Sequence, residues 1–299
     1  MFRVTGCLSV SGPLEPDLQA DQRATLADSL RELRHAAGLS GERLAARCAM
    51  SQAKISRIET GKTLPSVVDV EQIVKALGVP AEAADRLLSL TRVANVGYTS
   101  WRSAARVGSW HRQREIKALQ ESSAVVRQFL PAIPSGILQT PEYARAALTS
   151  PVPDAPDRDV EKMIDVRMGW KSNLADSGRA FKFVLTEQAV VWRRAPLEVM
   201  IGQLEHMADL STLDTVDLAV VPKEAEVFAA PLNIFVIHDE RLVTVELFSG
   251  GVALRDPRDV AYHLELFAFF RAQALEGGEA TGFLRSAADD FRRERRSGK

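Results

Sequence analysis

The segment from Ser51 to Ser66, "SQAKISRIETGKTLPS", gathers side chains that donate and accept hydrogen bonds around only two isoleucines. Hydroxyl, amide, ammonium and guanidinium groups can bind another polar surface when one helix face presents them together. A helix with a thin apolar seam turns most of its surface away from its own core. We therefore expect this segment to present a polar face to a partner molecule.

Five short helical patterns surround and include this segment. Apolar residues recur at helical spacing over 24–37, 40–48, 51–60, 66–77 and 80–90. Ser51 and Ser66 stand at N-cap positions, and Gly38 and Gly78 end two of the helices. Because only a short turn joins 40–48 to 51–60, this pair of helices predicts a helix-turn-helix motif.

The second helix of such a motif enters the DNA major groove by its N-terminal end. That position requires small or hydrogen-bonding side chains, and the first residues here meet the requirement: Ser51, Gln52, Ala53 and Lys54. Glutamine can bond adenine, arginine can bond guanine, and alanine can contact the thymine methyl group. The predicted phosphate contacts are Lys54, Arg57 and Lys62.

Charge is distributed unevenly, although the whole chain carries 38 basic and 39 acidic residues and a net charge of −1. Residues 31–62 contain seven basic side chains against three acidic ones, and residues 92–127 contain seven against two. A local basic excess attracts polyanions such as double-stranded DNA. The bulk composition alone indicates no partner.

The rest of the 299-residue chain is long enough for a second domain. We expect a flexible tail over 1–22, a helix-turn-helix domain over 23–95, a helical connector over 96–130, and a regulatory and dimerisation domain over 131–299. Strand-like runs occur at 181–185, 216–221, 233–237 and 242–248, and Gly250–Gly251 indicates a hairpin. The predicted fold class is α+β, with an all-α five-helix N-terminal domain and a small, mainly antiparallel sheet in the C-terminal domain.

The stretch "GLSGERLAARCAMSQAKISRIETGKTLPS" resembles the DNA-binding domain of Xre-type regulators, which are similar to phage repressors and Cro. The resemblance covers about residues 24–90. It implies base-facing positions at Gln52, Ala53 and Arg57, places Ser56 within the DNA-binding helix, and implies a structural ion pair between Arg34 and Glu59. Gly41 departs from the family pattern, which has glutamine there, and Ala49 replaces a glycine in the turn.

Residues 100–290 resemble the C-terminal domain of actinobacterial Xre-type regulators often called antitoxin-like. The motifs are "PAIPSGILQTPEYARAAL", "LTEQAVVW", "VMIGQLEHMADL" and "VELFSGG". The resemblance implies a regulator and offers a small companion protein as a partner. It implies no chemistry.

Candidate residues for chemistry and for ligand binding also occur elsewhere in the chain. The five histidines show no metal-ligand spacing, and no nucleotide-binding or nucleophile-elbow motif occurs. Glu187 and Glu246 could pair as acid and base, but a helix-cap acceptor and a sheet-face carboxylate are the simpler interpretation. Cys48 is expected in the core. A pocket for a small-molecule effector is an open alternative, with these aromatic residues as its lining: Trp101, Trp110, Phe129, Tyr143, Trp170, Trp192, Phe235 and Phe248.

The sequence thus predicts a cytoplasmic, sequence-specific DNA-binding transcriptional regulator without cofactor, metal, membrane partner or enzymatic activity. Its helix 51–60 binds an operator, and its C-terminal domain forms a homodimer and receives a signal. Three phenylalanines in four positions, Phe267, Phe269 and Phe270, cannot all point inwards from one helix, so we expect at least one of them to lie against a neighbouring layer or a second subunit. The alternative is an antitoxin-like interaction module that sequesters a small partner protein and regulates its own gene.

Overall fold

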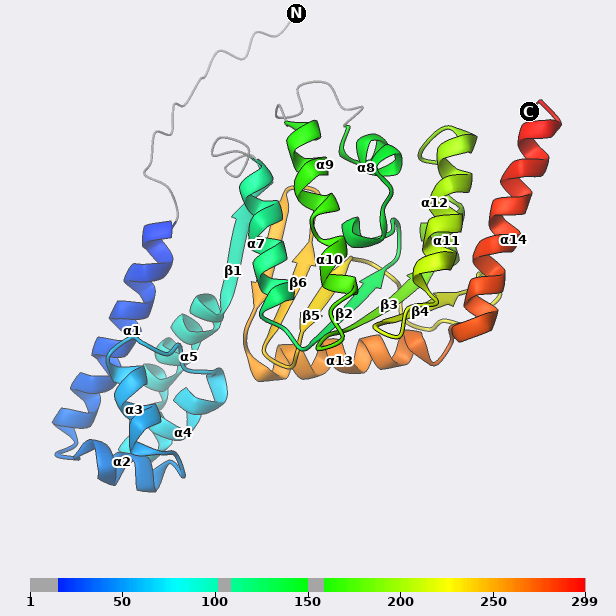
Figure 1. The fold of residues 1–299 in the computed structure, drawn as a ribbon. Helices are drawn as coiled ribbons and strands as arrows, with labels where there is room; N and C mark the ends of the chain where they lie inside the picture. The colour runs from blue at the N-terminus through cyan, green and yellow to red at the C-terminus, as the bar shows by residue number, and fades with distance from the viewer. Residues whose placement is uncertain (1–15, 102–108, 150–158, 299) are drawn as a thin grey trace, which may run out of the picture. The chain divides into compact units, whose positions relative to one another are not determined.

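The computed structural model describes residues 16–101, 109–149 and 159–298 (Figure 1). The chain divides into two compact units, Met1–Gly97 and Tyr98–Lys299. Each unit has its own hydrophobic core. No helix in the described ranges is long and apolar enough to cross a membrane.

The described residues of the first unit form five helices: α1 (Pro16–Ala36), α2 (Gly41–Arg47), α3 (Gln52–Glu59), α4 (Val67–Leu77) and α5 (Ala81–Asn95). Its core is made of the apolar residues that recur at helical spacing, including Leu26, Leu30, Leu44, Ile55, Ile58 and Ile73, each at most 1% exposed. Helix α1 begins at Pro16, so residues 16–22 are helical rather than part of a flexible tail. Residues 1–15 of that predicted tail lie outside the described residues.

Local capping sets the ends of these helices. The hydroxyls of Ser40, Ser51 and Ser66 each accept a hydrogen bond from a backbone N–H in the first turn of α2, α3 and α4. Between α2 and α3, Ala49 has a φ of 52°. This left-handed conformation, which costs a non-glycine residue roughly 1–2 kcal/mol, lies in the turn between the two helices.

The second unit is built on a seven-stranded mixed sheet with the order β1-β7-β6-β5-β2-β3-β4. The strands are β1 (Val96–Ser100), β2 (Val125–Leu130), β3 (Ala180–Thr186), β4 (Val216–Val221), β5 (Phe235–His238), β6 (Leu242–Glu246) and β7 (Gly250–Leu254). Strands β2, β3 and β4 are parallel, whereas β5, β6 and β7 continue the sheet in antiparallel fashion.

The expectation of a small, mainly antiparallel sheet was therefore wrong, although the α+β class is correct. Strands 181–185 and 216–221 are apolar runs because both of their faces are buried, which is typical of parallel strands joined by helices. Residues 96–130, expected as a helical connector, contribute β1 and β2 to the sheet, and among the residues described between these strands 109–121 are helical. The polar pair Arg127–Gln128 interrupts the apolar pattern of β2, so the sequence did not predict this strand. At the β6–β7 hairpin, Phe248–Ser249 form the turn, and Gly250–Gly251 already belong to β7.

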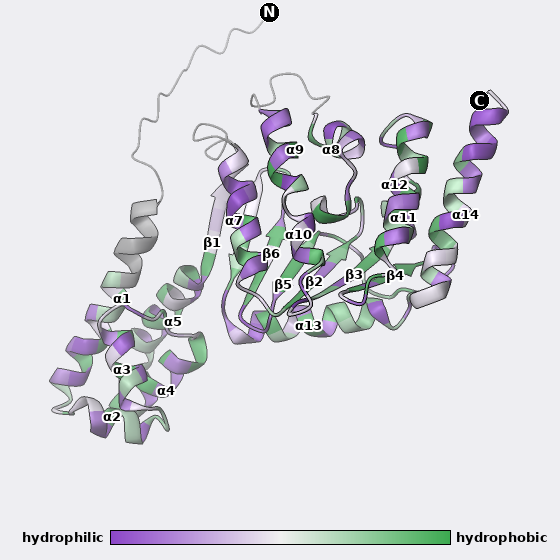
Figure 2. Ribbon diagram, in the orientation of Figure 1, coloured by the Kyte–Doolittle hydropathy of each residue, from purple (hydrophilic) through white to green (hydrophobic). Residues whose placement is uncertain are grey.

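Helices cover the two faces of the sheet unequally. One face, called here the helix-covered face, lies under α7 (Ser109–Glu121), η1 (Gly136–Leu138), α8 (Pro141–Leu148), α9 (Val160–Met168), α10 (Lys171–Leu174), α11 (Glu187–Val191), α12 (Leu197–Leu210) and α14 (Gly277–Arg296). The other face is covered by α13 (Pro257–Arg271) (Figure 1). The strands are largely apolar, whereas the outer surfaces of the helices are polar (Figure 2).

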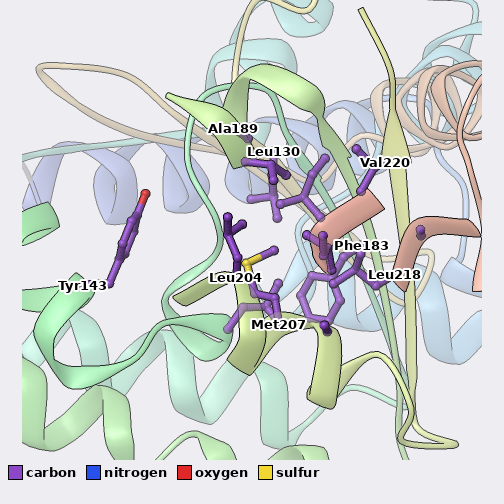
Figure 3. Packing of buried hydrophobic residues seen from close by; sticks show 14 of the residues in the cluster. Leu130, Tyr143, Phe183, Ala189, Leu204, Met207, Leu218 and Val220 are labelled. Carbon is purple, nitrogen blue, oxygen red and sulfur yellow. The ribbon is translucent and has the colours of Figure 1, made fainter. Parts of the chain in front are cut away.

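Two hydrophobic clusters hold the helices to the sheet. On the helix-covered face, Phe183 and Leu218 pack against Leu204 and Met207 of α12 (Figure 3). On the other face, Phe267 and Phe270 of α13 are buried, and Phe270 stacks on Phe129 with ring centroids 4.1 Å apart. Phe269 packs edge-on against Phe270 and is partly buried in the same cluster. All three phenylalanines therefore pack within the unit, and they give no support to a dimer.

Candidate functional site

Helix α3 divides its residues between the core and the solvent. Ile55 and Ile58 are each 1% exposed and attach the helix to the first unit. The opposite face consists of exposed residues: Gln52, Ala53, Ser56 and Arg57. Because these side chains lie along one edge of a short, rigid helix, the structure brings the predicted base-facing positions together.

Ser51 has two roles at the start of this helix. Its hydroxyl accepts a hydrogen bond of 3.2 Å from the backbone N–H of Lys54, which caps the helix. The residue is exposed, so the hydroxyl proton stays available to an outside acceptor. Gln52 extends next to the N-terminus of α2, where its Nε2 lies 4.0 Å from the position that a Cβ on Gly41 would take. A Cβ at position 41 would therefore be in ordinary van der Waals contact with Gln52.

Lys54, a predicted phosphate contact, also has an ion-pair partner within the protein. Its Nζ lies 2.6 Å from Oδ1 of Asp69, whose side chain is only 12% exposed. Asp69 also completes the capping box of α4 with Ser66. Lys54 therefore ties α3 to α4, a role that the sequence did not reveal because the partner is on another helix.

Arg34 and Glu59 form a two-point ion pair between α1 and the end of α3. Nε of Arg34 donates to Oε1 at 2.7 Å and its second terminal nitrogen donates to Oε2 at 2.8 Å. Arg34 also donates to the carbonyl oxygen of Leu39 at 2.9 Å. The hydrogen bond to Glu59 raises the pKa of Arg34 above its ordinary value. Because both side chains are about nine-tenths buried, this pair fixes the orientation of α3 more firmly than a surface pair would.

Lys62 follows α3 in an exposed loop. A hydrogen bond of 3.0 Å from the N–H of Thr63 to the carbonyl oxygen of Arg57 holds this loop against the helix. Arg57 and Lys62 therefore place two cations beside the amide and hydroxyl groups of α3. This arrangement matches the requirement of a helix that reads base edges while cations neutralise phosphates.

The second unit contains a cavity of about 230 Å³ under α7 and α9, on the helix-covered face of the sheet. Polar side chains make up much of its lining: Arg112, Gln113, Gln120, Gln128, Gln139, Arg167, His238, Thr244 and Glu246. Burial lowers the pKa of His238 to about 4, so this imidazole is neutral at physiological pH. Protein atoms around its carboxyl group raise the pKa of Glu246, against the opposing charges of Arg167 and Arg112, although the residue as a whole is exposed.

The aromatic residues that the sequence suggested for a pocket are mostly elsewhere. Trp170 lines the cavity, whereas Phe129 and Phe235 stack in the core of the α13 face. The remaining positions are as follows: Tyr143 is buried in the main cluster, Trp110 stacks on His111, Trp101 is half-buried against the hairpin, and Trp192 and Phe248 are exposed. The polar cavity residues were missed because most of them lie on α7, β2 and α9, whose association only the fold creates.

The two carboxylates considered as an acid–base pair have separate environments. Glu187 accepts a hydrogen bond of 2.9 Å from the backbone N–H of Lys223, so it acts as a loop acceptor. Glu246 lines the cavity, and Glu187 is not among the lining residues. Cys48 is buried in the first core, and burial raises the pKa of its thiol. Within the described ranges, no group of three or more metal-binding side chains is found.

Models of known protein families match residues in both units. Residues 113–286 match the model of a domain of unknown function, DUF5753, over more than half of the chain. The chain belongs to the DUF5753 family. Residues 25–87 match a helix-turn-helix domain, and this range holds α2, α3 and α4. The helix-turn-helix domain supports DNA binding by the chain.

No curated protein matches the chain. Among solved structures, it resembles Nuc, a phospholipase D family member from Salmonella typhimurium, at 15% identity and a TM-score of 0.35, covering 60% of this chain and 95% of that chain. It resembles the archaeal chromatin protein TrmBL2 at 16% identity and a TM-score of 0.32, covering 69% and 65%. NucT from Helicobacter pylori gives 10% identity and a TM-score of 0.33, covering 60% and 98%. At these scores the likenesses carry no argument about function.

Proposed function

We propose that this DUF5753 protein is a sequence-specific transcriptional regulator that binds its operator through α3. The observation that carries the proposal is the exposed edge of α3, where Gln52, Ala53 and Arg57 project from a helix anchored by Ile55 and Ile58. Buried isoleucines and the Arg34–Glu59 pair make this edge rigid, so little ordering entropy is lost on binding. The proposal assigns the chain to the Xre type, gives it no catalytic step, and places it in the cytoplasm with its DNA.

The proposal also includes pairing of the second unit. The most exposed large apolar side chains among the described residues of this unit are Phe228 at 90%, Leu232 at 80% and Phe248 at 110%. A hydrogen bond of 2.9 Å from the N–H of Glu246 to the carbonyl oxygen of Ile234 joins the segments that carry Leu232 and Phe248. Exposed apolar side chains of this size favour contact with another protein. A second copy of the chain is the proposed occupant, because a two-fold dimer reads two half-sites and a single recognition helix covers too few bases.

The same surface favours the second candidate function, in which an antitoxin-like module holds a small companion protein and DNA binding regulates its own gene. Light scattering separates the two on the full-length protein. A homodimer that Phe248→Ser and Leu232→Ser convert to monomer supports pairing of this chain. A wild-type monomer at micromolar concentration contradicts it, and a stoichiometric complex with a second small protein from the native host supports the alternative.

DNA binding is tested by selecting an operator from random duplexes with the full-length protein and titrating variants against it. Gln52→Ala and Arg57→Ala should each weaken operator binding by about 1–3 kcal/mol and relax the base preference. Lys62→Ala should weaken binding to all sequences alike and reduce the salt dependence.

The chain offers matched controls for these substitutions. Gln72 is an exposed glutamine on α4, and Arg86 is an exposed arginine on α5. Gln72→Ala and Arg86→Ala remove the same groups from other surfaces of the same unit, and they should leave operator affinity unchanged. If Gln52→Ala and Arg57→Ala behave like these controls, α3 is not the recognition helix.

A further inference from the structure

The cavity of the second unit is built from elements that are distant in the sequence. Ile116 comes from α7, Gln128 from β2, Arg167 from α9, and Thr244 from β6. Every residue that lines it belongs to the unit Tyr98–Lys299. With about 230 Å³, the cavity exceeds an engineered cavity of about 150 Å³ that accommodates benzene. Its size therefore suits a small molecule.

Gln128 is a polar side chain in an apolar part of the sheet. It lies opposite Phe183 of β3 and Val236 of β5, so its amide shares the helix-covered face with two apolar side chains. Gln128 is 2% exposed, and its Nε2 has no hydrogen-bond partner among the described residues. No described residue donates a hydrogen bond to its Oε1 either. A buried amide left in this way costs about 1–3 kcal/mol, which an apolar side chain of the same size would not cost.

Two further donors in the lining have no acceptor among the described residues. They are Nε1 of Trp170 and Nε of Arg112, and both atoms are shielded from solvent. The Trp170 ring fits beside Gly136, because a Cβ at position 136 would lie 2.8 Å from the ring. Donors without acceptors favour a ligand that brings an acceptor oxygen.

The arginines of the lining have partners within the protein, so they do not require an anionic ligand. A terminal nitrogen of Arg112 lies 3.0 Å from Oε2 of Glu115 in an ion pair. Nε of Arg167 donates to Oε1 of Gln113 at 3.0 Å, and a terminal nitrogen of Arg167 donates to Oε1 of Gln139 at 2.8 Å. These contacts hold both guanidinium groups at the wall of the cavity.

The acidic group of the lining balances the remaining charge. Protein atoms around the carboxyl group of Glu246 raise its pKa, and the charges of Arg167 and Arg112 oppose this rise. The residue as a whole is exposed. His238 is neutral at physiological pH, since burial lowers its pKa to about 4. Two arginines therefore stand against two carboxylates, those of Glu115 and Glu246, and this balance favours an uncharged ligand.

Much of the remaining lining is apolar. Ile116 and Leu119 of α7, Leu130 of β2, Ile133 and Val236 contribute side chains to it. Such surface binds the carbon skeleton of a ligand, while a small number of polar groups set its orientation. The two unpaired groups of the Gln128 amide are suited to that orienting role.

From these observations we infer that the cavity binds an uncharged cyclic amide, in which the N–H and the C=O lie on the same edge of a ring. The ligand N–H donates to Oε1 of Gln128, and Nε2 of Gln128 donates to the ligand carbonyl oxygen, so both groups of the side-chain amide are paired at once. Rotation about the terminal torsion of a glutamine is soft, and it brings the Gln128 amide into line with the ligand. The ring carbons pack on the apolar lining.

This inference gives a ligand class to the signal-receiving role of the second unit, and it rests on the proposed function for that role. The binding site itself does not depend on DNA recognition by α3. Binding can therefore be measured without an operator.

The test measures thermal stabilisation of the full-length protein, without DNA, by lactams and by analogues that lack the amide N–H. The probes are ε-caprolactam, its N-methyl derivative and ε-caprolactone, and likewise dihydroquinolinone, its N-methyl derivative and dihydrocoumarin. The analogues keep the ring and the carbonyl group. We expect at least one lactam to raise the melting temperature in a saturable manner, with an apparent affinity about tenfold or more above that of its two analogues.

Gln128→Leu should remove this preference, so that the lactam and its analogues bind alike. Gln188→Leu is the matched control, because it takes the same amide from the exposed surface of α11, and it should keep the wild-type response. Urea unfolding of each variant shows whether it is folded, and Gln128→Met replaces Gln128→Leu if the latter is not.

Three results would overturn the inference: equal responses to lactams and their analogues, an unchanged preference in the Gln128 variant, or no response to any lactam. Because DNA is absent, these failures leave operator binding by α3 untouched. A failed operator titration likewise leaves the cavity assignment untouched.

Discussion

The two halves of the helix-covered face of the sheet differ in what lies above them. Over β3 and β4, the side chains of Phe181, Phe183, Leu185, Leu218 and Val220 are at most 3% exposed and pack against α12 and α14. Over β2, β5 and β6, the same face presents Gln128, His238, Thr244 and Glu246 to a cavity under α7 and α9. One continuous sheet therefore supports a dense apolar core on one side and a polar hollow on the other.

The apolar half therefore contributes mainly to stability, and the polar half offers groups for recognition. Burial and close packing stabilise the folded state in the apolar half, and this stabilisation rises with every methylene group removed from water. The polar half leaves buried donors without acceptors among the described residues, which costs free energy. A costly arrangement of this kind is typical of a site that a ligand completes.

The largest effect is expected in the apolar half. Phe183 is fully buried between β3 and α12 (Figure 3), so Phe183→Ala should lower the free energy of unfolding by about 3–5 kcal/mol. Urea unfolding followed by circular dichroism measures this loss. Phe183→Leu keeps most of the volume and should cost less. If the two substitutions cost the same, the site is not closely packed.

A smaller effect, which depends on pH, is expected from His238 in the polar half. Its pKa is about 4 in the folded protein, below the ordinary value of about 6.5, because burial disfavours the imidazolium ion. As the pH falls from about 6.5 to 4, the unfolded chain takes up a proton that the folded chain rejects. Stability should therefore be complete above pH ~6.5 and fall by up to about 3 kcal/mol towards pH ~4.

Urea unfolding at a series of pH values tests this behaviour. His238→Gln removes the titrating group and keeps a polar side chain, so its stability should fall less steeply over the same interval. An acid limb identical to that of the wild type would show that other groups, not His238, control it.

The smallest effect has the opposite sign. Gln128→Leu replaces a buried amide that has an unpaired donor with an apolar side chain of similar size, and should raise the stability of the ligand-free protein by about 1 kcal/mol. The midpoint of urea unfolding measures the gain. A clear loss of stability would show that the amide is satisfied in solution, for example by water, and would weaken the contrast between the halves.

The prediction succeeded where local signals determine structure. Serine caps, glycine ends and isoleucines at helical spacing placed α2, α3 and α4 within a residue of their observed bounds. The exposed positions of Gln52 and Arg57 follow from the same spacing, since Ile55 and Ile58 must point inwards. Resemblance to known regulators indicated the pairing of Arg34 with Glu59 across twenty-five positions.

The prediction failed where pairing is remote. The phosphate contact of Lys54 stays a prediction, but the sequence did not indicate its ion pair with Asp69, which comes from the next helix and lies close only after folding. Strand β2 was assigned to a helical connector because Arg127 and Gln128 break its apolar pattern. In the sheet, Gln128 faces the cavity and Arg127 lies on the opposite side of the strand, where it is half-buried.

The sequence by itself determined the helix-turn-helix unit, because capping and periodicity act over a few residues and can be recognised without knowledge of the fold. Only the tertiary structure decided the strand order, the parallel pairing of β2 with β3, and the meeting of Arg112, Gln128, Arg167 and Glu246 around one cavity. These features depend on contacts between residues far apart in the chain. Such contacts are selected by the burial of whole surfaces, and no short stretch of sequence records which surfaces will meet.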